Sequence, residues 1–302
     1  MSWTTWFFEN QVRFQGEFLP NEPLSKHTYY KIGGPATLLL IPETLESLSW
    51  IQEGLKLMEC DFNIIGLGSN LLISDKGLDS LVIKTSKINS KIELLNETTI
   101  RVGAAVTVTS LLRVASQSGW AGLEWMTGIP GNVGGVVSMN AGTHLGEAKN
   151  SLIRVETFHL TRGLEIFTDQ QIRYEYRKNL FLEREHLITQ ADWRIARSNA
   201  DSVKTLIQET LARRKSTQPL EYPSCGSVFK NPAGKKAWEV LDALNLRGHQ
   251  IGQAQFSKKH PNFIVNLKGA LASDVWALIV LAKERAHTEL GIELQEEVKY
   301  LK

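Results

Sequence analysis

The sequence predicts a protein of the α+β class with two or three domains, and three observations lead to this prediction. The chain has 302 residues, whereas a single domain usually contains about 100–200. Its hydrophobic fraction is 42% and its charged fraction is 22%, which is typical of a globular protein with a sizeable core. Stretches with helical hydrophobic spacing also alternate with short stretches whose pattern is typical of strands.

Helices and strands are mixed in the first half of the chain. A short apolar run there leads directly into the segment Gly66-Leu-Gly-Ser-Asn70. The elements expected in this half are a helix over residues 45–58, a strand over 62–65, a strand and turn over 100–108, and a short helix over 111–118 that ends at Gly119.

The second half starts with a hairpin pattern and then mixes elements again. The elements expected are a hairpin of residues 153–155 and 164–166 with a turn at 161–163, a strand over 187–195, an amphipathic helix over 201–214 with Val203, Leu206, Ile207 and Leu211 on one side, a helix over 236–246, a strand over 263–266, a helix from the N-cap Ser273 to Leu290 with Gly291 after it, and a strand over 292–301. The basic, proline-containing stretch over 213–223 indicates a domain boundary.

Charge, cysteine content and hydropathy narrow the functional classes. The net charge is +2 with acidic and basic residues interspersed, so we do not expect a nucleic-acid-binding protein. The two cysteines, Cys60 and Cys225, form no CxxC pair and indicate neither a metal site nor a disulfide framework. The N-terminus lacks a basic signal region, and the longest apolar run, Val275–Ala282, is far below the ~18–20 residues of a membrane span. We therefore expect a cytoplasmic protein without membrane insertion.

The first glycine-rich segment directly follows an expected strand. Gly66 and Gly68 allow close approach of the backbone to phosphate oxygens, and Ser69 and Asn70 add side-chain donors. The pattern GxGxxG fails at Leu71 and no GK[ST] follows, so this is neither a Rossmann nor a P-loop fingerprint. Taken alone, the segment is equally compatible with a tight turn after the strand.

The second glycine-rich segment is the stronger signal. It has five glycines in fifteen residues, from Gly128 to Gly142, and Pro130 fixes one backbone angle. Its backbone can wrap a pyrophosphate or lie against a planar ring. A merely structural role is the less favoured alternative.

At this point the sequence resembles a known family. The two loops and five further motifs resemble, in the same order, those of the UDP-N-acetylenolpyruvoylglucosamine reductase (MurB) family, of the vanillyl-alcohol-oxidase/PCMH flavoprotein group. The resemblance covers nearly the whole chain from about residue 23. The motifs are HTYYKIGGPA, GLGSNLLI, GLEWMTGIPGNVGGVVSMNAG, YEYRKNLF, YPSCGSVFKNP, GQAQFSKKHPNFIVN and GIELQEEVKYL.

The resemblance implies a PCMH-type FAD-binding fold of two α+β subdomains, followed by an α+β substrate-binding domain. The expected divisions are an N-terminal extension (1–22), FAD-binding subdomain 1 (23–85), FAD-binding subdomain 2 (86–200) and the substrate-binding domain (201–302). The residues expected to bind FAD are Gly66, Gly68, Ser69, Asn70, Leu71, Gly128, Ile129, Pro130, Gly131, Gly134, Gly135, Asn140 and Gly142.

The resemblance also implies a reaction. The family reduces the enolpyruvyl ether of UDP-N-acetylglucosamine to UDP-N-acetylmuramate, a step in peptidoglycan precursor synthesis, with NADPH and FAD. Reduced FAD delivers hydride from N5 to the β-carbon, charge develops at the α-carbon and its carboxylate, and a proton must reach the α-carbon. The cofactor performs the hydride step, so the protein must position, polarise and protonate the substrate.

Three residues match the catalytic positions of the family. Arg177 can pair with the substrate carboxylate and absorb the developing charge. Ser227 matches the proton donor, and because a hydroxyl is a poor acid it needs a strongly polarising site. Glu297 matches the acidic residue of the final strand. Without the resemblance, Arg177 would be an ordinary strand or loop arginine and Ser227 a capping or turn serine. No paired His or Asn motif accompanies Cys225, so we expect it to be a packing residue.

Strand alternation and the motif disagree about the acid. Alternation places Glu296 on the apolar face with Leu294 and Val298, where an acid is unusual, and Glu297 on the opposite face. The pattern alone therefore favours Glu296, whereas the motif favours Glu297, and we follow the motif.

Other residues are expected to contact the UDP-sugar substrate, namely Tyr176, Lys230, Asn231, Gln255 and His260. A lone histidine is about as often structural, so a structural role of His260 stays open. Lys178 and Asn179 stand where many relatives have a serine shortly after the arginine, which leaves the support of Arg177 undetermined. The short stretch between Arg177 and Ser227 resembles the type II subgroup, and we expect a monomer.

Two alternative functions follow from the same loops. A different flavin oxidase or dehydrogenase of this fold would not need the CGSVFKNP motif or the acidic final strand. A non-catalytic flavin- or nucleotide-binding module would not need Arg177, Ser227 and Glu297 together.

Overall fold

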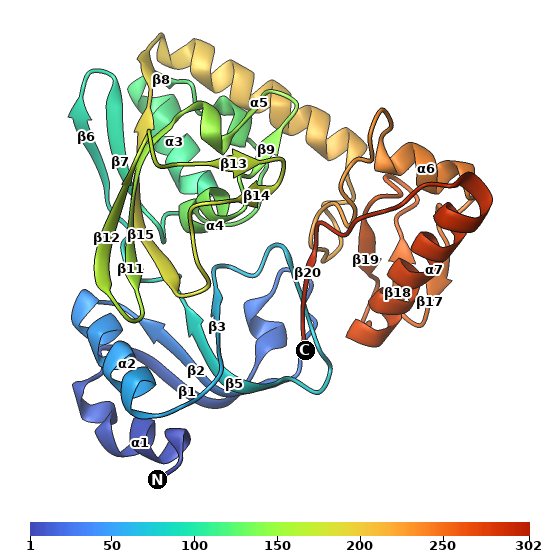
Figure 1. Cartoon of the computed structure of the whole chain (residues 1–302). Coiled ribbons are helices and arrows are strands. Elements are labelled where there is room, and N and C mark those ends of the chain that lie inside the picture. The colour runs from blue at the N-terminus through green and yellow to red at the C-terminus, as the bar shows by residue number, and fades with distance from the viewer. The chain divides into compact units, whose positions relative to one another are not determined.

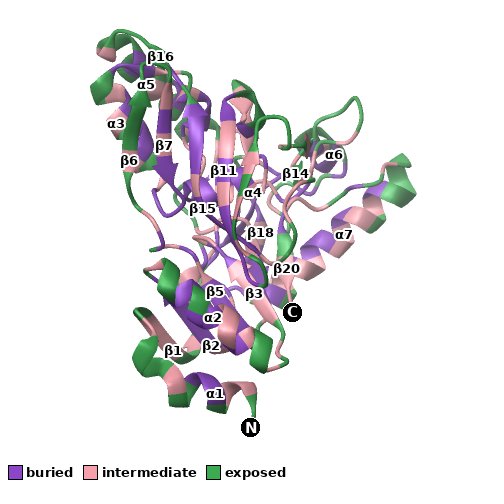
Figure 2. Ribbon diagram, turned by 60° about the vertical axis from the view of Figure 1, so that its left-hand side comes forward, coloured by how far each residue is buried: buried purple, intermediate pink, exposed green.

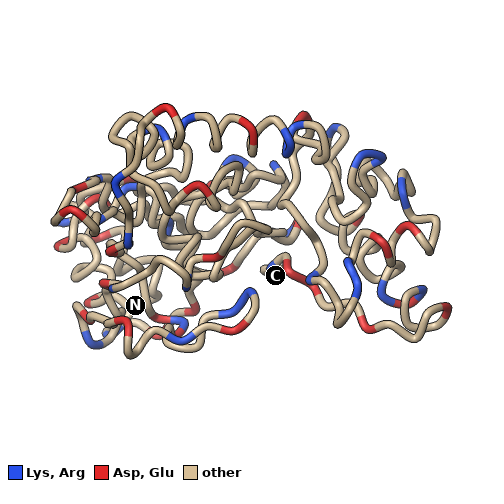
Figure 3. Tube along the Cα trace, turned by 90° about the horizontal axis from the view of Figure 1, so that it is seen from above, with Lys and Arg blue, Asp and Glu red and all other residues tan.

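The computed structural model describes residues 1–302 (Figure 1). The α-helices are α1 (Trp3–Asn10), α2 (Leu45–Leu57), α3 (Val108–Ser118), α4 (Val133–Ser138), α5 (Ala200–Thr217), α6 (Ala237–Ala243) and α7 (Ala272–Leu290). No helix has the length and apolar content that crossing a membrane requires. Lys and Arg residues are interspersed with Asp and Glu along the whole trace (Figure 3).

The strands are short and distributed along the whole chain. They are β1 (Gly16–Pro23), β2 (Pro35–Pro42), β3 (Phe62–Ile65), β4 (Leu71–Ile73), β5 (Leu78–Lys84), β6 (Ile92–Asn96), β7 (Thr99–Gly103), β8 (Trp120–Ala121), β9 (Gly142–Thr143), β10 (Gly146–Glu147), β11 (Leu152–His159), β12 (Gly163–Thr168), β13 (Tyr174–Glu175), β14 (Lys178–Asn179), β15 (His186–Arg194), β16 (Ala196–Arg197), β17 (Gln250–Ile251), β18 (Ala254–Phe256), β19 (Ile264–Asn266) and β20 (Lys299–Leu301). Together with the helices they confirm the expected α+β class.

The chain forms two compact units, and each is discontinuous in sequence. The first unit contains Met1–Pro20, Thr37–Leu67 and Ser80–Ala212, and the second contains Asn21–Ala36, Gly68–Asp79 and Arg213–Lys302. Each unit has its own hydrophobic core. Because the units interleave along the chain, they do not map one to one onto the expected sequential domains, and that functional division stays a prediction.

A five-stranded antiparallel sheet organises the first unit. Its strand order is β12-β11-β15-β7-β6, and α4 contacts β15 and β7. The inner strands β11 and β15 are largely buried, whereas the edge strand β6 is largely exposed (Figure 2). This arrangement fixes α4, which carries part of the second glycine-rich segment, against the centre of the sheet.

The aromatic N-terminal segment is ordered and packs on α2. Trp6 and Phe7 are buried, and both rings contact Trp50, with centroids 5.6 and 5.2 Å away. A Cβ atom at Gly54 would lie 2.5 Å from the Trp6 ring. Only glycine at this position of α2 therefore lets α1 approach so closely.

The second unit is built around α7 and a small sheet. The sheet has the order β17-β18-β19, and α7 contacts β17, β18 and α6. The last strand, β20, pairs in parallel with β4, which directly follows the GLGSN segment. The C-terminal end of the chain is thereby held beside the first glycine-rich motif.

Most expected elements are confirmed, including the hairpin of β11 and β12 and the helix end at Gly119, which is left-handed with φ +65°. The expected N-cap Ser273 is wrong. α7 begins at Ala272, and carboxylates supply the capping instead: Asp274 accepts the N–H of Leu271, and Asp75 accepts those of Ala272 and Ser273.

Helix α5 is longer than expected. It continues to Thr217 because Arg, Lys and Ser tolerate a helix and the first proline comes at Pro219. The expected apolar side is only partly buried. Val203 is buried, whereas Leu206 and Leu211 are exposed.

The expected final strand over residues 292–301 is also only partly correct. A regular strand forms only over β20. The preceding residues pair irregularly with residues 227–230: Lys230 N–H donates to Gln295 O, and Glu297 N–H donates to Val228 O. Such interrupted pairing does not make a continuous ladder.

Candidate active site

The glycine loop, residues 128–142, lies in the first unit and contains α4. Its main chain is fastened to the turn after β7, because Val133 N–H donates to Val106 O and Gly134 N–H to Ala104 O, at 2.9 and 3.0 Å. Gly128 and Gly131 have φ values of +74° and +122°. These values explain why glycine is needed there.

Asn132 is the residue of this loop that sequence reasoning missed. Its Oδ1 accepts the N–H of Gly135 and caps α4, while a Cβ atom at Gly66 would lie 2.9 Å from the same oxygen. Its Nδ2 is buried and has no hydrogen-bond acceptor in the protein. Buried donors in native proteins are nearly always satisfied, so an acceptor supplied by a ligand is expected here. The Asn-Val-Gly-Gly sequence was the available signal, because Asn is a favoured N-cap.

These features fit FAD. Because Gly66 and Gly135 have no side chains, the space beside Asn132 is open. The Nδ2 donor of Asn132 has no hydrogen-bond acceptor within the protein. A flavin ring or pyrophosphate oxygen supplies such an acceptor. The residues that would hold it in the first unit are therefore Gly66, Gly131, Asn132, Gly134 and Gly135. The individual FAD-binding assignments stay predictions.

Asn140 organises the end of the glycine loop. It is fully buried with φ +44°, its Nδ2 donates to Glu147 Oε2 and Glu175 O, and its Oδ1 accepts the N–H of Lys149. The whole side-chain amide is thus used within the protein. Gly142 has no room for a side chain, because a Cβ atom would lie 2.6 Å from Glu147 Cβ.

Arg177 lies in the arginine hairpin, residues 174–179, which consists of β13, β14 and the two-residue turn Tyr176-Arg177. Arg177 has φ +57°, which is unusual for a residue other than glycine. Its Nη2 donates to Gly142 O at 2.7 Å and its Nη1 to Asn140 O at 3.4 Å. The guanidinium also lies 5.1 Å from the centre of the half-exposed Tyr176 ring. The structure therefore brings Arg177 together with the end of the glycine loop.

The rest of the first glycine-rich motif lies in the second unit. Gly68 has φ +69°, and a Cβ atom there would lie 2.3 Å from His27 O. Ser69 and Leu71 are half-buried on either side of Asn70. Asn70 Nδ2 donates to Glu297 O at 2.9 Å, and Asn70 O accepts the N–H of Lys299. Asn70 therefore anchors the end of the chain in addition to any expected contact with FAD.

Ser227 lies in the serine segment, residues 225–230. The segment starts with a turn at Gly226, whose φ of +82° favours glycine, and Ser227 then pairs with Phe263 in an isolated bridge. Val228 connects two neighbours: its N–H donates to Asn262 O at 2.8 Å, and its carbonyl accepts the N–H of Glu297 at 2.7 Å. The main chain thereby fixes Ser227 and Glu297 relative to one another.

Asn262 holds the other side of the serine segment. It is 4% exposed, its Oδ1 accepts the N–H of Phe229 at 3.0 Å, and its Nδ2 donates to Phe229 O at 2.9 Å. The side-chain amide thus imitates a neighbouring strand. Asn262 lies within the motif GQAQFSKKHPNFIVN, but no local sequence pattern indicates this role.

The two candidate acids are both half-buried, and their charged neighbours distinguish them. Glu296 forms an ion pair with Lys283 of α7, at 2.7 Å. Glu297 lies near Cys225: burial first, and then the Glu297 charge, raise the pKa of the Cys225 thiol to about 12. Burial and the raised pKa favour the expected packing role of Cys225. The main chain of both acids adjoins the serine segment, Glu296 opposite Phe229 and Glu297 at Val228, so the choice of Glu297 stays a prediction of the motif.

The expected substrate residues of the second unit have different surroundings. Asn231 Oδ1 accepts the N–H of Ala237 at the start of α6, and Gln255 Nε2 donates to Gln250 Oε1. Lys230 is half-buried and its N–H is used by Gln295 O. His260 packs edge-on against Phe263, burial lowers its pKa, and its Nδ1 has no hydrogen-bond partner. Asn231 is thus committed to the fold, whereas His260 keeps an unsatisfied nitrogen.

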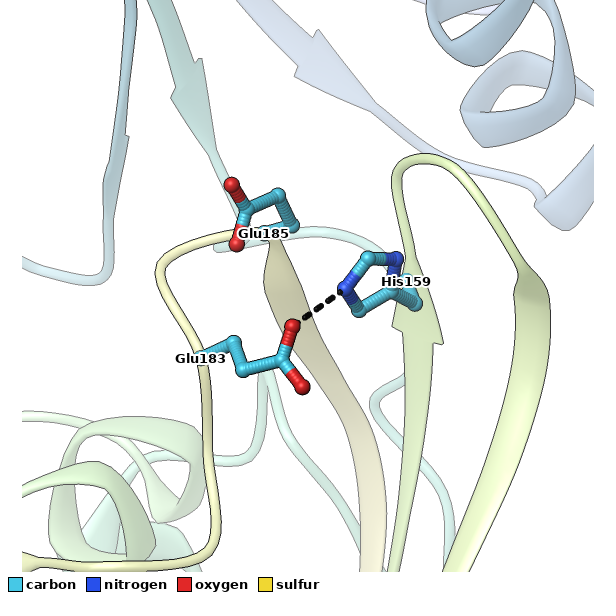
Figure 4. A group of neighbouring side chains, drawn as sticks. All are labelled: His159, Glu183 and Glu185. Carbon is cyan, nitrogen blue, oxygen red and sulfur yellow. Dashed lines mark hydrogen bonds and ion pairs between the residues drawn. The ribbon is translucent and has the colours of Figure 1, made fainter.

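A separate group on the first unit has the composition of a metal site (Figure 4). The possible ligand atoms of His159, Glu183 and Glu185 lie within 4.8 Å of one another. However, Nδ1 of His159 accepts the backbone N–H groups of Thr161 and Arg162, at 3.1 and 3.3 Å. The imidazole proton is therefore on Nε2, where it donates to Glu183 at 3.2 Å. A metal ion would need a lone pair on Nε2, which the proton occupies. The arrangement is therefore a hydrogen-bonded histidine and not a metal site.

Comparison with known proteins now gives the family context. Residues 36–163 match the model of an FAD binding domain, and residues 218–301 match that of the C-terminal domain of UDP-N-acetylenolpyruvoylglucosamine reductase. The chain therefore contains an FAD-binding domain, which confirms the expected cofactor and FAD-binding fold.

Similar proteins match over nearly their whole length. The UDP-N-acetylenolpyruvoylglucosamine reductase of Carboxydothermus hydrogenoformans is 38% identical, with 96% of this chain and 95% of that protein covered. The one of Halalkalibacterium halodurans is 37% identical, with 95% of each covered. The crystal structure of the reductase MurB from Thermus caldophilus has 32% identity and a TM-score of 0.81, and covers 95% of this chain and 99% of that one.

Proposed function

Because the chain belongs to the UDP-N-acetylenolpyruvoylglucosamine reductase family, an oxidoreductase family, we propose that it uses NADPH to reduce the enolpyruvyl ether of UDP-N-acetylglucosamine to UDP-N-acetylmuramate. This would place it in peptidoglycan precursor synthesis. The observation that carries the proposal is the main-chain connection of Ser227 to Glu297 through Val228, beside Asn70 of the glycine motif. Neither alternative function gives a reason for this connection.

When bound, FAD would supply the hydride chemistry between NADPH and the enolpyruvyl β-carbon. The glycine loop and Asn132 would hold it in the first unit. Side chains of the protein must then stabilise the negative charge and deliver the proton.

Arg177 would stabilise the substrate carboxylate. Carbonyl oxygens of Asn140 and Gly142 accept hydrogen bonds from its guanidinium and orient it. A guanidinium has five N–H donors, so it can donate to both oxygens of a carboxylate while keeping the bonds to these carbonyls. As charge develops on the carboxylate and α-carbon, the interaction strengthens, which is the condition for catalysis.

Ser227 would protonate the α-carbon. The chain turns at Gly226, directly before Ser227, and the bridge to Phe263 fixes the main chain of Ser227. Glu297 would orient or polarise the reacting groups from the neighbouring segment. Tyr176, Lys230, Gln255 and His260 would contact the UDP-sugar, and the orphaned Nδ1 of His260 supports its assignment.

A direct test uses the purified protein under anaerobic conditions. We expect a yellow protein whose flavin absorbance is bleached by NADPH and restored by the UDP-enolpyruvyl substrate. A colourless protein that cannot be loaded with FAD would refute the proposal, and so would reduced flavin that the substrate does not reoxidise. Comparison of NADPH with NADH in the bleaching step tests the proposed nucleotide preference. We further propose a cytoplasmic monomer, which sedimentation of the loaded protein and cell fractionation would test.

A further inference from the structure

We propose that Tyr174 and Asn179 are positioning residues for Arg177, because they fasten both strands of the arginine hairpin to the C-terminal end of α4. This inference rests on the proposed function for its catalytic consequence. It also explains what supports Arg177 in this chain, where Lys178 and Asn179 stand in place of the serine that many relatives have shortly after the arginine.

The contacts that carry the proposal come from both sides of the hairpin. Tyr174 Oη donates to Val137 O at 2.6 Å, and Asn179 Nδ2 donates to Ser138 O at 2.8 Å. The two acceptors are consecutive carbonyls in the last turn of α4. Carbonyls at a helix end lack partners within the helix and carry partial negative charge, so they are well suited to side-chain donors.

The donors are suited to a fixed attachment. Burial raises the pKa of the Tyr174 hydroxyl, so the group stays protonated and keeps donating. Its ring packs edge-on against Phe181, with centroids 5.3 Å apart. Asn179 uses its other end as well, since its Oδ1 accepts the N–H of Leu182 at 3.2 Å. Both side chains are thereby held at the base of the hairpin.

The turn needs such a base because Arg177 has an unfavourable backbone conformation. A residue other than glycine keeps φ near +57° only where the surrounding structure determines it. Pairing of β13 with β14 is too short to do so alone. The bonds from Tyr174 and Asn179 constrain the base of the hairpin, in addition to the bond from Asn140 to Glu175 O.

Helix α4 therefore links two parts of the site within the first unit. Its N-terminal end carries Asn132, Gly134 and Gly135, which would hold the cofactor, and its C-terminal carbonyls hold the hairpin that carries Arg177. A helix of six residues is a short, rigid spacer. The position of the guanidinium is thus fixed relative to the glycine loop, and not relative to the edge of the sheet.

The test uses two conservative variants and one matched control. Tyr174→Phe removes only the donor to Val137, and Asn179→Asp removes the donor to Ser138 while keeping the acceptor for Leu182. Lys178→Ala alters an exposed residue of the same hairpin, whose pair with Glu175 is solvent-exposed. We expect each of the first two variants to slow reoxidation of the NADPH-reduced flavin by the substrate about fivefold, the scale of one net hydrogen bond. Flavin reduction by NADPH, and the control variant, should be unchanged within about twofold.

A double-mutant cycle separates positioning from a general structural role. If Tyr174 acts through Arg177, then Tyr174→Phe should have no further effect in an Arg177→Ala background. An equal fivefold loss in both backgrounds would overturn the proposal. So would unchanged reoxidation in both Tyr174→Phe and Asn179→Asp.

A second measurement does not depend on the proposed function. Trypsin cleaves after Arg177 and Lys178 only when the hairpin opens, and mass spectrometry of the peptides follows that cleavage. We expect it to be about fivefold faster in Tyr174→Phe and Asn179→Asp than in the wild-type protein at equal global stability. Unchanged cleavage would refute the attachment itself. Faster cleavage in a protein that never reduces the substrate would instead refute the proposed function and leave the attachment intact.

Discussion

The two units hold their candidate catalytic residues in different ways. In the first unit, side chains fasten the arginine hairpin to main-chain carbonyls of α4 and of the glycine loop. In the second unit, the main chain of the serine segment pairs directly with the segments of Asn262 and Glu297. The first arrangement can therefore be loosened one side chain at a time. The second is fixed chiefly by backbone bonds that substitutions do not remove.

This difference bears on the two chemical tasks proposed. Charge stabilisation by a guanidinium tolerates small displacements, because Coulomb attraction falls off slowly with distance. Proton transfer requires hydrogen-bond reach, so small displacements of the donor matter more. The more rigid type of attachment is thus found where the geometry is more demanding.

The largest expected effect tests the second unit. Ser227→Ala should still let NADPH reduce the flavin, yet slow reoxidation by the substrate at least ~10²-fold, the lower scale for a positioned proton donor. Stopped-flow absorbance separates the two half-reactions. Ser224→Ala, in the same motif, should react at close to the wild-type rate. Wild-type reoxidation in Ser227→Ala would remove Ser227 from the role of acid.

A comparison of the adjacent acids should give the next largest effect. Glu297→Gln is expected to slow reoxidation roughly tenfold or more, because it removes the charge beside the serine segment. Glu296→Gln removes only the half-exposed pair with Lys283 and should cost less than about 1 kcal/mol of stability with little change in rate. The reverse ranking in single-turnover measurements would show that strand alternation, and not the motif, identifies the acid.

Asn262 gives a pH-dependent test of the side-chain bonds that supplement this backbone attachment. Asn262→Asp keeps an acceptor for Phe229 N–H, but its ionised form places negative charge against Phe229 O, whereas its protonated form can donate to that oxygen. Burial raises the pKa of such a carboxyl, so protonation is reachable in mild acid.

We therefore expect reoxidation in Asn262→Asp to be about tenfold slower than in the wild type at about pH 8 and to approach the wild-type rate at about pH 5.5. Asn262→Ala should stay slow at every pH. Parallel pH profiles for the two variants would mean that the amide does not act through these two bonds.

The comparison also shows what a sequence can predict. The mixture of helices and strands and most elements follow from periodicity, which is a local property, whereas the FAD-binding fold follows from the resemblance of the motifs to a known family. The capping of α7 was wrong because Asp75, about two hundred residues away in sequence, supplies the carboxylate. The roles of Tyr174 and Asn262 were equally invisible, since each depends on a carbonyl that only the folded chain brings near. Asn132 alone had a local signal, the favoured N-cap before Gly-Gly.

The smallest expected effect concerns the stability of the first unit in acid. Hydrogen bonding to Arg162, and secondarily to His186, lowers the pKa of Glu165 to about 2 from an ordinary value of 4.5. A lowered carboxyl pKa stabilises the folded state above pH 4.5, and this stabilisation is lost as the pH falls toward 2. Because the side chain is 25% exposed, we expect a contribution of only about 1 kcal/mol at pH 7.

Glu165→Gln should thus lower the free energy of unfolding by about that amount at pH 7 and by much less near pH 2.5. Tryptophan fluorescence in urea is the suitable measurement, because six of the eight tryptophans, Trp3, Trp6, Trp50, Trp120, Trp125 and Trp193, lie in the first unit. Glu289→Gln, which removes the exposed pair with Arg285 on α7 of the second unit, is the matched control and should leave that transition in place. An equal shift of the urea unfolding transition in both variants would show that the two units unfold as one. The difference in how the units hold their candidate catalytic residues would then not extend to their stability.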